Sequence, residues 1–222
     1  MSRSNNVLGE HSDGYPGGAG AFGHDASSSG AALQAAAEML AAEPYITVTL
    51  ERIASIVQVP IENIEKWFPT MHALGAAVLD YERECMRRNQ REAARRTSNP
   101  IERLLFVFRS IGDDLANDVV VRAGVRLAGE SRQHFPERRL DPFAVWRDFV
   151  FRQLDEAKNK GLLHDRVNLD ETVWLIVAAG MGTKDLLASR NAWTEAPARL
   201  EATLNTILML VRSETSVDLR DG

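Results

Sequence analysis

The residues most often used in catalysis and metal binding are few and scattered in this chain of 222 residues. Cys85 is the single cysteine, so no disulfide can form within the chain, which favours a reducing cytoplasm. No glycine-rich phosphate loop follows a strand. The five histidines show none of the short spacings of metal ligands; they are His11, His24, His72, His134 and His164. We therefore expect no metal site and no cofactor.

Charge is the first chemical signal, and it lies in the stretch PIENIEKWFPTMHAL, residues 60–74. The stretch has the length and apolar spacing of a short helix that enters the major groove of DNA. It nevertheless carries Glu62 and Glu65, which would meet phosphates. From residue 24 to residue 80 the chain has seven acidic and only two basic residues, Arg52 and Lys66. Because cations that neutralise phosphates supply much of protein–DNA affinity, this segment predicts weak DNA binding.

The whole chain has a net charge of −5, so it is not a general binder of polyanions. One basic stripe stands out, in which arginines recur every fourth residue along a predicted helix: Arg83, Arg87, Arg91 and Arg95. A solvated helix face, partly paired with Glu84 and Glu92, explains this spacing. A docking surface for an acidic partner or a phosphate-bearing ligand is the alternative.

Helical periodicity dominates the sequence after residue 30 and predicts an all-α fold of about nine helices. Expected helices cover residues 31–42, 49–57, 61–68, a long segment ending before Asn99-Pro100, 101–116, 119–130, a segment from Pro142 to near Gly161, 169–190 and 195–212. Residues 131–142 are expected to form a loop. The longest uncharged apolar run, from Thr172 to Thr183, is too short to cross a membrane.

The composition divides the chain into four parts. Residues 1–30 hold seven glycines and are predicted to be a flexible tail. Residues 31–78 form a helix-turn-helix domain, residues 79–213 a larger helical domain, and residues 214–222 a C-terminal tail. The faces of the last two helices are strongly apolar and predict a dimer interface; they carry Val173, Ile176, Val177, Leu200, Leu204, Ile207 and Val211.

Residues 35–79, AAAEMLAAEPYITVTLERIASIVQVPIENIEKWFPTMHALGAAVL, resemble the N-terminal domain of the TetR family of transcriptional regulators. Three later stretches are similar to its γ-butyrolactone receptor branch: NDVVVRAGVRLAGE (117–130), AVWRDFVFRQLDEAKNKGLL (144–163) and ASRNAWTEAPARLEATLNTIL (188–208). The resemblance covers residues 31–212. It implies a cytoplasmic homodimer that releases DNA when a small hydrophobic ligand, butyrolactone-like or antibiotic-like, binds the C-terminal domain, as in the control of secondary metabolism.

The DNA-contacting positions depart from the family pattern. Gln58 stands where the family has a glycine, and Pro60 replaces the serine or threonine that begins the recognition helix. Met71 replaces a phosphate-binding lysine. The resemblance leaves these DNA-binding candidates: Thr49, Asn63, Lys66 and Trp67. The segment thus keeps the apolar core residues of the family, while its DNA-contacting surface is predicted to bind DNA more weakly.

The same resemblance implies three ligand-contacting residues. Trp146 matches a tryptophan of the receptor pocket, and Glu82 and Met181 stand where the branch has a glutamine and a threonine. Trp146 and Met181 also suit an ordinary core. A carboxyl group at Glu82 in an apolar pocket could donate a hydrogen bond, pair with a cation or act as a general acid. Alternatively, Glu82 points outward or pairs with an arginine.

Three classes of function remain open. The first is a ligand-responsive regulator with weakened DNA binding. The second is a DNA-silent homologue that binds a ligand or forms a heterodimer with a related receptor. The third is an enzyme derived from the ligand pocket, with Glu82 as candidate acid or base. The sequence itself favours no catalytic mechanism.

Overall fold

The computed structural model describes residues 26–213, which form nine α-helices and three short 3₁₀ segments. The predicted all-α fold is confirmed. The helices are α1 (Ala26–Ala42), α2 (Leu50–Val57), α3 (Ile61–Trp67), α4 (Met71–Arg96), α5 (Pro100–Asn117), α6 (Val119–His134), α7 (Pro142–Asn159), α8 (Leu169–Ser189) and α9 (Ala196–Val211). No helix in this described part is both long and apolar enough to cross a membrane.

Most helix ends form where the sequence signals predicted them. The hydroxyl oxygens of Thr49 and Thr70 accept backbone N–H groups at the starts of α2 and α4. Pro100 and Pro142 occupy the first turns of α5 and α7, where no N–H partner is needed. The turn between α2 and α3 is made by Gln58, which adopts a left-handed conformation with φ of 56°.

Two boundaries differ from the sequence predictions. Helix α1 begins at Ala26, five residues inside the predicted tail; the rest of that tail and residues 214–222 lie outside the described chain. Helix α6 continues through residues 131–134, which were predicted to be a loop. Tertiary packing explains this extra turn, because Phe135, which follows it, is fully buried.

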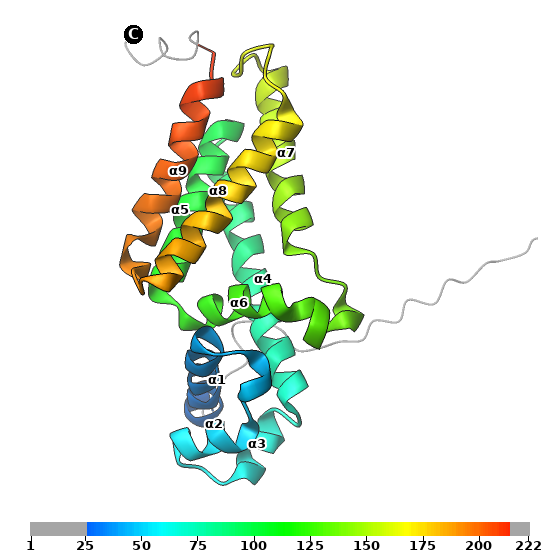
Figure 1. The fold of residues 1–222 in the computed structure, drawn as a ribbon, viewed down its shortest axis with the longest axis vertical. Helices are drawn as coiled ribbons and strands as arrows, with labels where there is room; N and C mark the ends of the chain where they lie inside the picture. The colour runs from blue at the N-terminus through cyan, green and yellow to red at the C-terminus, as the bar shows by residue number, and fades with distance from the viewer. Residues whose placement is uncertain (1–25, 214–222) are drawn as a thin grey trace, which may run out of the picture.

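Figure 1 shows three layers along the molecule: α1–α3 at one end, the upright helices α5, α7, α8 and α9 at the other, and α6 lying across between them. We call α1–α3 with the first turns of α4 the head, and the upright helices with the rest of α4 the body. The head encloses its own apolar core around Ile53, Ile64 and Leu74. The body encloses a second core around Leu104, Leu154 and Leu204.

Helices α4 and α6 take part in both cores. On α4, Leu79 belongs to the head core and Cys85 to the body core. On α6, Val120, Ala123 and Leu127 pack in the head core. Val121 of α6 packs in the body core. The head is therefore completed by a helix that lies far outside residues 31–78.

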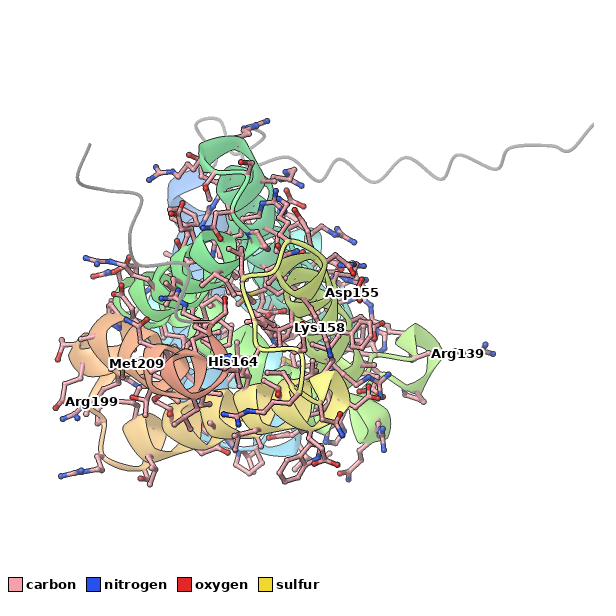
Figure 2. All side chains as sticks on the ribbon, turned by 90° about the horizontal axis from the view of Figure 1, so that it is seen from above. Arg139, Asp155, Lys158, His164, Arg199 and Met209 are labelled. Carbon is pink, nitrogen blue, oxygen red and sulfur yellow. The ribbon has the colours of Figure 1, made fainter. Side chains whose placement is uncertain are left out.

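The apolar faces of α8 and α9 are arranged differently from the prediction. Five of the seven predicted interface residues are buried inside the subunit. Val173 and Ile176 lie on α8, which packs against α7 and α9, and Leu200, Leu204 and Ile207 lie on α9, which packs against α5. The prediction that these five residues form a dimer interface is therefore wrong. Other large apolar side chains are exposed instead: Trp174, Leu175 and Leu186 on α8, and Met209 and Leu210 on α9. Figure 2 looks onto the end opposite the head and labels Met209 on α9, which runs beside α8 along the margin of the body.

Candidate functional site

A cavity of about 140 Å³ lies inside the body. All the body helices contribute to its wall. The lining residues are Glu82 and Met86 of α4; Phe108, Ile111 and Leu115 of α5; Val125, Ala128 and Gly129 of α6; Pro142, Phe143 and Trp146 of α7; Ile176, Val177, Gly180, Met181 and Lys184 of α8; and Leu200 of α9. The three residues predicted to contact ligand, Glu82, Trp146 and Met181, thus share one cavity. That they bind a ligand remains a prediction.

Trp146 is held in the cavity wall by two aromatic neighbours. Its ring meets Phe108 and Phe149 edge to face, with centroids 6.0 Å apart in both pairs. Such contacts fix ring orientation beyond what apolar burial alone does. Phe149 is buried next to Trp146, whereas Phe143 at the edge of the cavity is 59% exposed.

Glu82 is the acidic side chain of the cavity wall. Burial among apolar groups raises the pKa of the Glu82 carboxyl to about 7, although the neighbouring Arg83 acts to lower it. The carboxyl group therefore changes charge near neutral pH. The outward orientation considered from the sequence is not what the structure has.

Lys184 is the other ionisable side chain among the lining residues. Its ammonium nitrogen lies 2.6 Å from a carboxylate oxygen of Asp185, whose side chain is 70% exposed. The Lys184 side chain is 23% exposed, and Asp185, which does not line the cavity, offsets its positive charge.

Gly124 brings α6 against Glu82. A Cβ atom added at Gly124 would lie only 2.3 Å from the Cβ atom of Glu82, so no other residue fits without moving a helix. Glu82 itself lies between Leu79 of the head core and Cys85 of the body core. The cavity therefore meets the head at the crossing of α4 and α6. Sequence reasoning missed Gly124, because a glycine inside a helix gives no sign of what approaches it.

Both ends of α6 are also tied to α4. At the first end, Asp118 accepts N–H groups of Val120 and Val121, and the Tyr81 hydroxyl donates to Asp118 over 2.7 Å. At the other end, Phe135 packs against Tyr45 and against His72 of α4, with centroids 5.2 and 4.8 Å apart. A displacement of α6 would therefore be transmitted to the head.

The predicted DNA-contacting residues all lie on the head. Thr49 is engaged as the cap of α2, with its hydroxyl 3.3 Å from the backbone nitrogen of Arg52. On α3, the ammonium group of Lys66 donates a hydrogen bond to the side-chain oxygen of Asn63 over 3.4 Å. Trp67 is partly buried against the head core rather than presented freely to a groove. Glu62 and Glu65 are exposed on the same helix.

Arg52 is occupied within the head. Its guanidinium donates to both carboxylate oxygens of Glu43, over 3.0 and 2.8 Å, and to the carbonyl oxygen of Thr47. The Arg52 guanidinium in turn holds the pKa of Glu43 below its ordinary value. Of the two head cations, one is thus paired internally.

The architecture has well-defined counterparts among solved structures. A γ-butyrolactone receptor described as an ArpA-like protein superposes with a TM-score of 0.71 at 20% identity, over 86% of this chain and 91% of the receptor. The TetR family protein CprB from S. coelicolor A3(2) superposes with a TM-score of 0.68 at 22% identity, over 85% of this chain and 91% of CprB. This is the TetR fold.

The TetR fold also accommodates more distant sequences. SmeT in complex with triclosan superposes with a TM-score of 0.67 at 15% identity, over 85% of this chain and 93% of SmeT. At the level of sequence, no family model matches the chain and no curated protein is similar enough to count as a relative. The resemblance stated from the sequence is therefore confirmed for the fold, over most of the chain.

Two of the four arginines in the stripe of α4, Arg87 and Arg91, form ion pairs with the same carboxylate. Glu84 lies 3.7 Å from Arg87 and 2.5 Å from Arg91, measured between carboxylate oxygen and guanidinium nitrogen. Neighbouring Arg96 pairs with Glu92 at 2.7 Å, and Arg88 pairs with Asp114 at 3.1 Å. These pairs support the solvated-face explanation of the stripe.

Proposed function

We propose that this protein is a ligand-responsive transcriptional regulator in which a small hydrophobic molecule occupies the body cavity and repositions the head. The observation that carries this proposal is the position of the cavity. Its wall includes α4 and α6, the two helices that belong to both cores. A ligand that fits one arrangement of these helices better than another shifts the population between them.

The TetR-fold neighbours support the same proposal by their names, since they include γ-butyrolactone receptors and a complex with triclosan. We infer that a small, mostly apolar ligand binds here as well, against Trp146, Met181 and Glu82. We also infer a homodimer, formed through the exposed apolar residues of α8 and α9. An isologous contact between two such faces would remove Trp174, Leu186 and Met209 from water.

The head is proposed to bind DNA weakly. Within residues 26–80, six acidic side chains stand against Arg52 and Lys66, and Arg52 already pairs with Glu43 at 2.8 Å. Few phosphates can be neutralised by such a surface, and the exposed Glu62 and Glu65 repel the duplex. The head keeps its core, because Ile64 of α3 is fully buried there.

The acidic head favours one further candidate function, a DNA-silent homologue that binds ligand or pairs with a related receptor. The enzyme hypothesis gains less support. The residues that line the cavity include no serine, threonine, cysteine, tyrosine or histidine, and the ionisable group other than Glu82 is Lys184, which pairs with Asp185.

Gel-shift titration tests the regulator proposal. Fragments carrying the promoters of the protein's own gene cluster are titrated at low and moderate salt, with and without culture extract as a source of ligand. Weak, strongly salt-dependent binding that the extract reverses is expected. Trp146→Ala should abolish the response to extract while circular dichroism shows the fold unchanged.

Two results would contradict the proposal in different ways. Nanomolar binding to a specific operator in physiological salt would refute the weakened head and leave a plain regulator. A complete lack of DNA binding at every salt concentration, for the full chain, would favour the DNA-silent candidate instead.

A further inference from the structure

The cavity contains a carboxyl group that the protein does not pair. Within residues 26–213, the Glu82 carboxylate takes part in no hydrogen bond or ion pair. Arg83, which is exposed on α4, is the charged side chain that acts to lower the pKa of Glu82. Lys184 does not fill this role, because its ammonium group lies against Asp185 at 2.6 Å. The apolar wall thus contains one carboxyl group that is not paired with a positively charged group of the protein.

The rest of the cavity wall offers very few polar groups. Its lining contains no serine, threonine, tyrosine, histidine, asparagine or glutamine side chain. A neutral ligand with several hydroxyl or carbonyl groups would lose its hydration there without replacement hydrogen bonds, which is costly. A molecule whose polarity is concentrated in one group fits this wall better.

Aromatic rings gather in the same cavity. Phe108, Phe143 and Trp146 line it, and Trp146 is held by its edge-to-face contacts with Phe108 and Phe149. The faces of such rings attract cations, and tryptophan does so most strongly. A carboxylate together with aromatic rings is the chemistry that recognises an ammonium group.

We propose that the cavity binds an organic cation: a small apolar molecule carrying one ammonium group, which pairs with the Glu82 carboxylate while its body packs against Phe108 and Trp146. This inference rests on the proposed function of the cavity as a ligand site. The cavity volume of about 140 Å³ suits a ligand of roughly one ring. Ionisation of Glu82 then accompanies binding, because the cation stabilises the charged form.

A pair of isosteric probes separates charge from shape. The cation 3-hydroxyphenyltrimethylammonium and the neutral 3-tert-butylphenol differ only in a quaternary nitrogen replaced by carbon. Isothermal titration calorimetry at pH 8 with the full-length protein measures both dissociation constants. We expect the dissociation constant of the cation to be lower than that of the neutral probe by at least about tenfold.

Glu82→Gln assigns the preference to one group. The variant should weaken binding of the cation by about tenfold and leave binding of the neutral probe within about twofold. Glu84→Gln is the matched control. It makes the same change two residues along α4, on an exposed side chain paired with Arg91 outside the cavity, and should alter neither affinity. Thermal melting of both variants verifies that they fold.

The outcomes distinguish the two levels of the proposal. Equal binding of the two probes to the wild-type protein, or a cation preference that survives Glu82→Gln, overturns the organic-cation assignment and leaves the cavity as a ligand site. If neither probe binds the wild-type protein at millimolar concentration, the cation assignment and the proposed ligand site both fail.

Discussion

Gly124 of α6 lies directly against Glu82 of α4, so closely that an added Cβ at Gly124 would stand 2.3 Å from the Glu82 Cβ. This contact places the acidic residue of the cavity at the crossing of the two helices that link body and head. Five residues further along α6, Gly129 lines the cavity, yet a Cβ there would meet nothing within 4 Å. The two glycines thus differ only in what faces them.

Alanine substitutions at these glycines should have opposite effects on stability. Gly124→Ala forces α4 and α6 apart and is expected to lower the free energy of unfolding by about 1–3 kcal/mol. Gly129→Ala removes a flexible residue from a helix without a clash and should raise it by about 0.5–1 kcal/mol. Urea denaturation followed by circular dichroism measures both. Equal effects from the two variants would show that the crossing is looser than described.

Stability should fall as pH rises through the titration of Glu82. The unfolded chain loses this proton near the ordinary pKa of 4.5, whereas the folded protein keeps it until about pH 7. Between these pH values the folded state binds more protons, so raising the pH destabilises it. Glu82→Gln should therefore be more stable than the wild type at pH 8, on the order of 1–3 kcal/mol, and close to it at pH 5. Urea titrations at the two pH values, with Glu84→Gln as control, test this; a pH-independent difference would argue against it.

Replacing Gln58 in its left-handed turn by glycine should raise the stability of the protein. Its φ of 56° is a conformation that side chains with a Cβ disfavour. Gln58→Gly is expected to stabilise the protein by about 0.5–1 kcal/mol, since glycine adopts this conformation readily. Gln34→Gly places the same substitution inside α1 and should destabilise it by about 1 kcal/mol. Thermal melting compares the two, and a loss of stability at Gln58 would mean that its side chain contributes more than the turn costs.

Dimer formation should depend on the exposed apolar faces of α8 and α9. Met209→Glu, on a side chain that is 70% exposed, should convert a dimer to monomers at micromolar concentration, because it places a charge in the proposed contact. Val145→Glu makes a similar change at a side chain of α7 that is 55% exposed, outside the proposed contact of α8 and α9, and should leave the dimer intact. Sedimentation velocity measures both species. A wild-type protein that sediments as a monomer would refute the interface.

Charge reversal on α3 tests the weakened head. Glu65→Lys should raise affinity for duplex DNA several-fold at low salt and steepen the log–log salt dependence by about one unit, as expected for one added phosphate contact. Asp155→Lys changes the net charge equally in the last part of α7, which lies at the end away from the head (Figure 1). Fluorescence anisotropy with labelled duplex reports both affinities. If Asp155→Lys works as well as Glu65→Lys, net charge rather than the head governs binding.

Local signals in the sequence determined most of the helices of this protein. The cap at Thr49, the proline in the first turn of α7 and helical periodicity act over a few residues, so they can be read without knowing the fold. The resemblance to TetR regulators added the association of Glu82, Trp146 and Met181, which do share one cavity. Their spacing along the chain alone could not have brought them together.

Only the tertiary structure decided which apolar faces are covered. Helices α8 and α9 have apolar residues on more than one side, and periodicity cannot tell which side another helix will bury. The packing of α5 against α9 buries Leu200 and Leu204 and leaves Met209 and Leu210 exposed. In the same way, α6 completes the head core and Gly124 admits Glu82 because of how distant helices cross. Such contacts join residues far apart in sequence, and no local pattern records them.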